Sequence, residues 1–297
     1  MRPLHFLAAL AVVVIWGFNF VVIKIGLTEL PPLLMCALRF FLAAFPAVFF
    51  IARPRVSLGL VALYGLLMFA LQFALLFVGM YLGVSAGLAA LCLQVHVFIT
   101  MALASLFLGE RLSPIRIAGA VIAFAGIGIV GVNIGGDVTF VGLALVLLAA
   151  CAWGLANLVS KKIGQVDMLA LIVWGSLAAP LPLLGLSFLL EGWDRIVAGV
   201  MQMSWVSIWA VSYIVYPTTL VGFSVWSWLL SRYPASTVAP VTLLVPVVGL
   251  ASSVVVLGEP LQSWKIAAAG LVCLGIGINM LGPRLVRYGA LARVRPH

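Results

Sequence analysis

The chain has 297 residues, of which 65% are hydrophobic and 8% charged, and its formal net charge is +9. A soluble protein of this length needs a much more charged surface, so this composition excludes one. Apolar runs of membrane-crossing length recur along the chain, and in such proteins basic residues mostly mark cytoplasmic loops. We therefore predict an all-α polytopic membrane protein and do not interpret the positive charge as affinity for nucleic acid.

Reading the apolar runs between helix breakers predicts ten transmembrane helices joined by short loops, with no room for a soluble domain. The first run continues at spanning length to Lys24, so we interpret it as a helix and not as a cleaved signal peptide. The predicted spans are 5–26, 33–52, 58–80, 84–108, 115–133, 139–160, 168–190, 205–230, 235–257 and 263–282.

The Lys and Arg residues predict the orientation of the chain. If the N-terminus is inside, twelve of the sixteen basic residues fall on the inner side, three on the outer side, and Arg39 within a span. This strong bias predicts that both termini are cytoplasmic. Residues 284–297 are then a basic cytoplasmic tail.

The first span contains a pattern that returns later in the chain. Trp16, Asn19 and Lys24 lie in "WGFNFVVIK", and "WGLANLVSK" repeats the tryptophan-glycine pair and the lysine 137 residues further on. Likewise Leu-Gly-Glu at 108–110 recurs at 257–259, an offset of 149. The offset grows by 12, which places an insertion in the outer loop after the seventh span.

The two copies predict two five-helix repeats, residues 1–134 and 135–283. An odd number of spans per repeat gives the second copy the opposite orientation in the membrane. Inverted repeats of this kind are typical of secondary transporters, which bind their substrate near the membrane midplane between the repeats.

Polar side chains inside spans are costly and are therefore candidate functional residues. Arg39, in the second span, could attract a carboxylate group or be a structural arginine near the outer interface. Gln72, in the third span, could contact the substrate or join helices. In the fourth span His96 and Thr100 share a face, Gln94 lies about 200° from His96, and His96 is either a substrate contact or a histidine bonded to a neighbouring helix.

The sixth span presents Trp153 and Asn157 on one stripe, as the first span presents Trp16 and Asn19. Interfacial tryptophans are common in membrane proteins, but these two lie some two turns from the charged helix ends. We therefore expect both stripes to line a cavity. Lys24 is expected to mark the end of its helix.

The eighth and ninth spans contain internal prolines, which release backbone carbonyl groups and interrupt a helix. Pro217 lies beside two further substrate-site candidates, Tyr213 and Tyr216, and Pro240 and Pro246 interrupt the ninth span. These three prolines are hinge candidates, with packing kinks as the alternative.

The remaining features predict no chemistry. All seven acidic residues fall in loops or at helix ends, and the four cysteines lie apart within apolar runs. We therefore expect no catalytic residues, no metal site and no cofactor. The Gly- and Ala-rich fifth and tenth spans indicate close helix packing or dimerisation.

Together these residues resemble the drug/metabolite transporter superfamily in its EamA-type branch, which has ten helices in two repeats. The matching features are Trp16-Gly17, Asn19, Lys24, Pro31-Pro32, Arg39 and the two Gly-Glu pairs. The segments "WGFNFVVIKIGL", "ELPPLL" and "LVPVVGLASS" are similar to the O-acetylserine/cysteine and aromatic-amino-acid exporter groups. One departure is "QVHVFIT" in the fourth span, where many first repeats carry a proline.

The resemblance implies export of amino acids or related metabolites across a bacterial inner membrane through a central cavity. We predict an alternating-access transporter, not an enzyme, whose partners are a small-molecule substrate and the lipid bilayer, with a homo-oligomer left open. The alternative is a broad-specificity multidrug or metabolite carrier. An intramembrane enzyme is the alternative from another class, and it is disfavoured because no carboxylate lies deep in a span.

Overall fold

Ten segments of the described chain are helical, long and apolar enough to cross a membrane. A computed structural model describes the backbone of residues 1–293 and the side chains of residues 1–234 and 237–282. The ten segments are Pro3–Gly26, Pro32–Phe49, Leu58–Tyr81, Ala86–Leu108, Pro114–Val132, Phe140–Ile163, Met168–Leu190, Trp205–Arg232, Ala239–Leu257 and Ser263–Gly282. Their bounds agree with the predicted spans to within a few residues, and the predicted fold class is confirmed.

Several spans are divided into more than one helical element. The elements in the first repeat are α1 (Pro3–Gly26), α2 (Pro32–Ala44), η1 (Ala47–Phe49), α3 (Leu58–Gly65), η2 (Leu66–Leu71), α4 (Gln72–Tyr81), α5 (Ala86–Leu93), α6 (His96–Leu108) and α7 (Pro114–Val132). Those in the second repeat are α8 (Phe140–Ile163), α9 (Met168–Ser176), α10 (Pro180–Leu190), α11 (Trp193–Met201), α12 (Trp205–Tyr213), η3 (Ile214–Val221), α13 (Gly222–Arg232), α14 (Ala235–Val238), η4 (Ala239–Leu244), α15 (Val245–Leu257) and α16 (Ser263–Arg293).

The helix ends follow local sequence rules. Helices α1, α2, α7 and α10 have a proline in their first turn, where the missing N–H costs no hydrogen bond. Helices α6 and α15 end at Gly109 and Gly258, whose φ angles of 68° and 66° are left-handed and favour glycine. These two glycines occupy equivalent positions in the two repeats, so the fourth and the ninth span end with the same turn.

The interruptions of the helices also fall at equivalent places in the two repeats. The third and eighth spans each contain a π-helical segment, η2 and η3, and the eighth contains Pro217. The ninth span passes through the 3₁₀ segment η4, which contains Pro240. The fourth span breaks at Gln94 and Val95, between α5 and α6. The proline-marked interruptions were predicted; η2 and the break in the fourth span were not.

Helices α7 and α16 are in direct backbone contact, as their small residues predicted. A Cβ atom on Gly275 would lie 2.4 Å from the carbonyl oxygen of Gly119, and one on Gly126 would lie 2.8 Å from that of Ala268. The repeat offset of 149 converts the second pair into the first, so this contact is nearly symmetric. Only residues without a large side chain allow helices to approach so closely.

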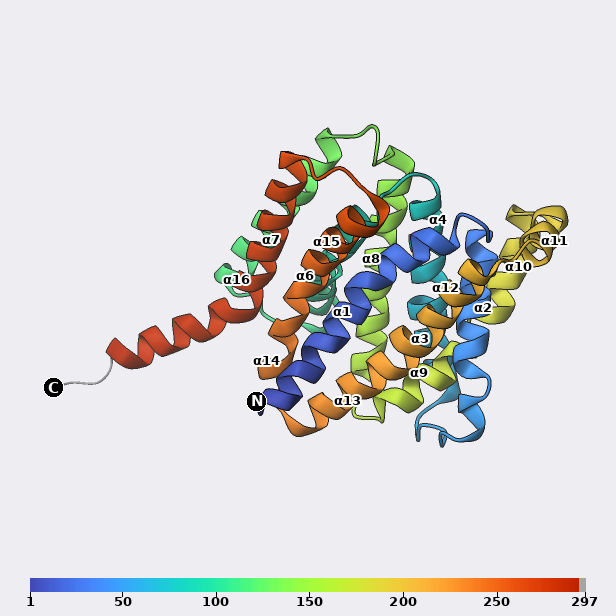
Figure 1. Ribbon diagram of the computed structural model, residues 1–297. Helices are drawn as coiled ribbons and strands as arrows, with labels where there is room; N and C mark the ends of the chain where they lie inside the picture. The colour runs from blue at the N-terminus through green and yellow to red at the C-terminus, as the bar shows by residue number, and fades with distance from the viewer. Residues whose placement is uncertain (294–297) are drawn as a thin grey trace.

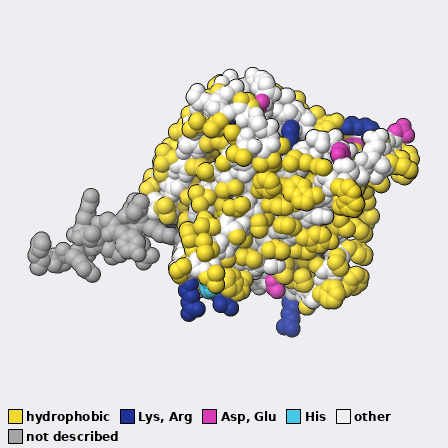
Figure 2. Space-filling model, in the orientation of Figure 1, with side chains coloured by type: hydrophobic (Ala, Val, Ile, Leu, Met, Phe, Trp, Pro, Cys, Tyr) yellow, Lys and Arg dark blue, Asp and Glu magenta, His cyan; other side chains and the backbone are white. Residues whose placement is uncertain are grey.

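Figure 1 shows the bundle with α7 and α16 on one side and α2 and α10 on the other. We call the end that holds the N-terminus the amino end, and the end reached by α1 at Gly26 the opposite end. The predicted insertion forms α11, which lies at the opposite end beyond α10. Figure 2 shows hydrophobic side chains covering the middle of the visible face, with Lys and Arg side chains projecting from the amino end.

Candidate functional site

Four polar and aromatic residues of the fourth and sixth spans meet at the start of α6. The rings of His96 and Trp153 are stacked, with their centroids 3.9 Å apart and their planes at 10°. One helical turn on, the Asn157 amide donates to the Thr100 hydroxyl at 3.0 Å. A Cβ atom on Gly154 would lie 2.8 Å from Ile99, so this glycine lets α8 approach α6. The structure thus brings together three predicted site residues, His96, Trp153 and Asn157.

The break between α5 and α6 determines how His96 is hydrogen-bonded. The Nδ1 atom of His96 lies 3.0 Å from the carbonyl oxygen of Leu93. A carbonyl oxygen can only accept, so Nδ1 carries the hydrogen and Nε2 of the neutral ring is an acceptor. The Thr100 hydroxyl donates to the His96 carbonyl at 2.7 Å, and His96, Trp153 and Asn157 are all only partly buried. The cluster therefore combines an aromatic face with polar atoms on residues that the protein does not fully enclose.

Trp16, the counterpart of Trp153, has different neighbours. Its indole N–H donates to the carbonyl oxygen of Thr218 at 3.1 Å, next to Pro217 in η3. The Tyr213 hydroxyl donates to the carbonyl oxygen of Ile15 at 3.2 Å. These bonds join α1 to the interrupted eighth span. Trp16 and Tyr213 therefore both join α1 to the eighth span, and their hydrogen-bond partners differ from those of the His96 cluster.

Two predicted amide residues are buried without full hydrogen bonding. Asn19 is 5% exposed and its side-chain oxygen has no partner among the described residues, while Gln72 is fully buried with neither side-chain polar atom bonded. Unpaired buried amides are expensive. They mark places where a water molecule or a substrate would be stabilised.

Arg39 is sealed inside the bundle and does not reach an interface. It is 1% exposed, donates to the Thr219 hydroxyl at 3.2 Å, and its guanidinium carbon lies 4.2 Å from the ring centroid of Phe73. Its Nε and Nη1 atoms have no partner within the described residues. The aromatic ring and the hydroxyl partly replace the hydration of the guanidinium.

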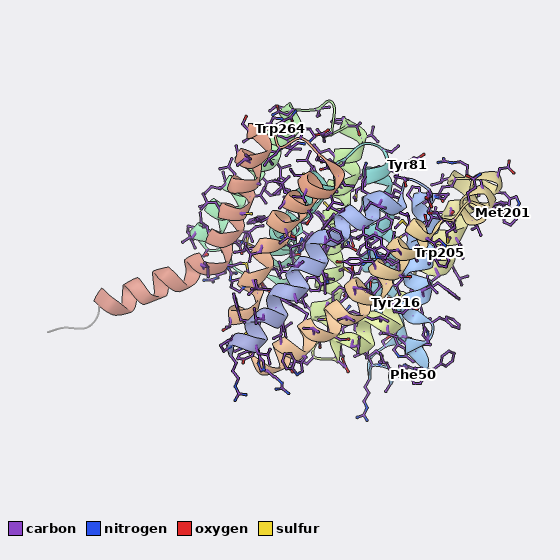
Figure 3. The ribbon with its side chains drawn as sticks, viewed as in Figure 1. Phe50, Tyr81, Met201, Trp205, Tyr216 and Trp264 are labelled. Atoms are coloured by element: carbon purple, nitrogen blue, oxygen red, sulfur yellow. The ribbon has the colours of Figure 1, made fainter. Side chains whose placement is uncertain are left out.

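The other predicted residues are distributed over the bundle. Lys24, in the last turn of α1, donates to the carbonyl oxygen of Met80 in α4 at 2.7 Å. Gln94 is half-buried at the break of the fourth span. Tyr216 is 47% exposed and lies at the surface of the bundle (Figure 3). Pro240 lies in η4 and Pro246 in the first turn of α15.

Two glutamates contact backbone groups of other spans, and sequence reasoning assigned neither of them a role. Glu259 accepts from the N–H groups of Ala86 and Gly87, at 2.8 and 3.3 Å. Glu191 accepts from the N–H groups of Leu33 and Leu34, at 2.6 and 3.2 Å. The recurrence of Gly-Glu after the fourth and ninth spans was a signal for the first of these contacts.

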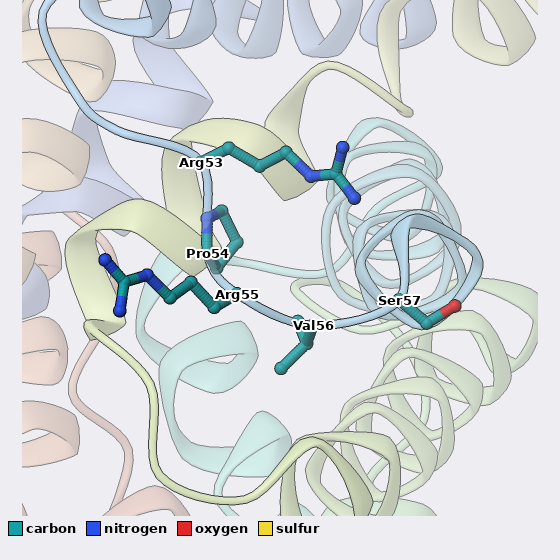
Figure 4. A pocket seen from close by; sticks show the side chains of 5 residues that line it. All are labelled: Arg53, Pro54, Arg55, Val56 and Ser57. Carbon is teal, nitrogen blue, oxygen red and sulfur yellow. The ribbon is translucent and has the colours of Figure 1, made fainter.

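A surface hollow of about 440 Å³ lies in the loop before α3, lined by Arg53, Pro54, Arg55, Val56 and Ser57 (Figure 4). All five residues are consecutive, and none belongs to the clusters described above. A single exposed loop is a poor basis for a selective binding site, because selective sites need groups converging from several elements. We assign the hollow no role.

Comparison with known proteins agrees with this architecture. The chain is 44% identical over 285 residues to a probable amino-acid metabolite efflux pump of Salmonella typhimurium, covering 94% of this chain and 95% of the relative. It is 40% identical over 283 residues to a protein of the same description from Escherichia coli, covering 93% and 94%. One solved crystal structure superposes with a TM-score of 0.62 at 17% identity, covering 96% of this chain and 99% of the other, which supports the fold alone.

The sequence profile of the EamA-like transporter family matches this chain twice, over residues 4–132 and 140–281. The two matches coincide with the two five-helix repeats. They span the ten membrane helices and leave out only the short loop between α7 and α8 and the ends of the chain. The chain is therefore a multi-pass membrane protein that belongs to the EamA-like transporter family.

Proposed function

We propose that this transporter exports amino acids or related small metabolites by alternating access between its two repeats. The observation that carries the proposal is the 44% identity, over almost the whole chain, to a relative described as a probable amino-acid metabolite efflux pump. The symmetric placement of interrupted helices supports it, because π-helical segments and broken spans often accompany transport sites.

The His96 cluster is the best candidate for direct contact with the substrate. The stacked pair of His96 and Trp153 offers an aromatic surface, and His96 Nε2 and the Asn157 side-chain oxygen offer acceptors for an ammonium or hydroxyl group. An amino-acid metabolite presents both an apolar and a hydrogen-bonding part. The remaining candidates, Trp16, Asn19, Gln72, Gln94, Tyr213 and Tyr216, stay proposals of lower rank because their contacts do not converge on this cluster.

We also propose a bacterial inner-membrane location with both termini in the cytoplasm. The location is supported by relatives described as inner membrane transporters, and the orientation by the bias of Lys and Arg in the sequence toward the loops on the side of the termini. In this orientation the amino end is where the substrate enters and the opposite end is where it leaves.

The test is a flux measurement with purified protein in proteoliposomes. The panel is labelled cysteine, O-acetylserine and the aromatic amino acids, each with and without a pH gradient. We expect transport of at least one compound. Failure to transport any amino acid or amino-acid derivative would contradict the proposal. Flux driven by the gradient and lost in His96→Ala indicates coupling through the histidine, whereas gradient-independent flux indicates facilitated diffusion.

A further inference from the structure

The two repeats end their fourth and ninth spans with the same backbone turn. Gly109 and Gly258 have φ angles of 68° and 66°, and in each case the next residue's N–H closes on a carbonyl group six residues back, at 3.4 and 3.3 Å. Glu110 and Glu259 follow these glycines and are equivalent at the offset of 149. Their backbones match, so any difference between their carboxylates reflects their surroundings.

At the opposite end, Glu259 binds the start of a span from the other repeat. Its two oxygens accept from the first N–H groups of α5, those of Ala86 and Gly87. A carboxylate at a helix N-terminus satisfies free N–H groups and interacts favourably with the helix dipole. Since Glu259 belongs to the second repeat and α5 to the first, the contact ties the two repeats together.

At the amino end, Glu110 has a different partner. It forms an ion pair with Lys161, with an N–O distance of 2.6 Å, and both side chains are nearly half exposed. Lys161 is the repeat counterpart of Lys24. By the repeat offset, the counterparts of Ala86 and Gly87 are residues 235 and 236, in α14, which leads directly into the ninth span. Glu110 therefore contacts the lysine, whereas Glu259 contacts the helix start.

The helices that surround the two glutamates also pack differently at the two ends. At the opposite end α5 lies against α15, and a Cβ atom on Gly87 would lie 2.6 Å from the Ser253 hydroxyl. At the amino end the equivalent elements are α6 and the segment of α14 and η4. In the described structure α6 packs on α8, and η4 packs on α1, α15 and α16 without a comparable contact to α6. Among the described residues, α5 and α15 thus close the opposite end, whereas η4 and α6 form no comparable seam at the amino end.

We propose that Glu259 and Glu110 hold the two ends of the transporter closed in turn. Each does so by binding its carboxylate to the first N–H groups of the broken span in the other repeat. When the opposite end opens, Glu259 moves to Lys24, and Glu110 leaves Lys161 for the start of the ninth span. This proposal rests on the alternating access of the proposed function.

The charges around Lys24 are arranged for such an exchange. The other acid whose charge acts on Lys24, Asp137, is already paired with Lys265, which also donates to the carbonyl oxygen of Pro260 at 2.7 Å. Lys24 itself donates only to carbonyl groups, the nearer being Met80. A released Glu259 would thus find a lysine without a carboxylate partner. Because one helix-start contact and one lysine pair exist in each state, the exchange costs little net free energy.

The test compares the same substitution at two equivalent positions. Glu259→Gln removes two charge-assisted bonds from the closed opposite end but only one lysine pair from the state in which that end is open, so its net effect is to weaken the closed opposite end. By the same reasoning Glu110→Gln weakens the closed amino end. The reporter is Ser253→Cys, in a chain whose four native cysteines are replaced; Ser253 is fully buried in the seam between α5 and α15. Its reaction with a water-soluble maleimide is measured in lipid nanodiscs, where both faces are accessible and the orientation does not matter.

We expect Glu259→Gln to raise the labelling rate about tenfold, the effect of one lost charge-assisted hydrogen bond, and Glu110→Gln to lower it. Asp194→Asn, at an exposed aspartate of α11, is the matched control and leaves the rate unchanged. Equal rates in the two glutamine variants, or shifts in the same direction, overturn the exchange. No substrate is added, so the exchange can fail while export stands, and a chain that exports no amino acid can still show opposite shifts.

Discussion

At the scale of single residues, the polar and aromatic side chains at the start of α6 are the best-defined candidates for contact with a substrate. The stack of His96 on Trp153 uses the ring face, and the bond to the Leu93 carbonyl fixes which nitrogen carries the hydrogen. The repeat counterpart of His96 is Val245, which offers no polar atom. Substrate chemistry is therefore expected to differ between the two halves even though their backbones correspond.

His96→Phe separates the two contributions of the histidine. The phenyl ring preserves stacking on Trp153 but removes the acceptor at Nε2. We expect a rise of about tenfold in the apparent KM for export, the size of one lost hydrogen bond to a charged group, with normal folding. Trp205→Phe, which removes a polar N–H from an aromatic side chain that is 83% exposed in α12, is the control and leaves the KM unchanged. An unaltered KM in His96→Phe would mean that the imidazole nitrogen does not contact the substrate.

Glu29, in the loop between α1 and α2, predicts a pH effect on stability. Its carboxylate accepts from the backbone N–H and hydroxyl of Ser204 and from the Ser207 hydroxyl. These bonds lower its pKa, the bond from Ser207 contributing most. When the pKa of a carboxyl group is lower in the folded than in the unfolded state, the group stabilises the folded state at pH values above its unfolded pKa. This stabilisation is lost as the pH falls through the lower, folded-state pKa.

Glu29→Gln should therefore lower the Tm at pH 7, and the difference from the wild type should shrink as the pH is reduced below 4.5, the ordinary pKa. The measurement is thermal unfolding in detergent over this pH range. Asp194→Asn serves as the comparison without such bonds. A difference in Tm that stays constant with pH would contradict the assignment.

At the scale of elements, hydropathy and helix punctuation predicted all ten spans, because spanning length and terminal prolines are local properties. Prolines also marked η3 and η4. The π-helical segment η2 and the break at Gln94 and Val95 carry no local signal, since they depend on how neighbouring spans pack. For the same reason the sequence could not predict the partners of the two tryptophans, the Thr218 carbonyl group for Trp16 and the His96 ring for Trp153. That the two stripes line a cavity stays a prediction.

The contact between α7 and α16 predicts sharply different effects for neighbouring glycines. Gly275→Leu must separate the helices, because its Cβ already meets the Gly119 carbonyl at 2.4 Å. We expect a loss of about 1–3 kcal/mol in the free energy of unfolding. Gly277→Ala, where nothing lies within 4 Å, should be neutral or slightly stabilising. Thermal unfolding of both variants checks this, and equal effects would refute the close contact.

At the scale of the whole molecule, the two ends differ in charge and in closure. Among the residues whose side chains are described, the amino end carries most of the basic residues and shows no close seam between α6 and η4, whereas at the opposite end Glu259 binds the start of α5 and α11 is added. Composition could predict the charge bias. It could not predict which end is closed, because both ends share the same Gly-Glu turn.

Cysteine labelling tests the orientation of the molecule. Met201, 81% exposed in α11, lies at the opposite end (Figure 3), and Ser57 is exposed in the loop before α3. In a background without native cysteines, we expect Met201→Cys to react with a membrane-impermeant maleimide in intact cells. Ser57→Cys should react only after permeabilisation. The reverse pattern would place the termini outside.

The near-symmetric contact of α7 with α16 also has an evolutionary consequence. If a five-helix ancestor paired with an inverted copy of itself, the same residue would have stood at both ends of this contact. Each mutation of that residue would then have changed both ends at once. Joining the two copies in one chain removes that constraint. The two ends of the contact now differ by one methyl group: Gly126 contacts Ala268 at one end, whereas Gly275 contacts Gly119 at the other. After duplication, a substitution could change one end without changing the other.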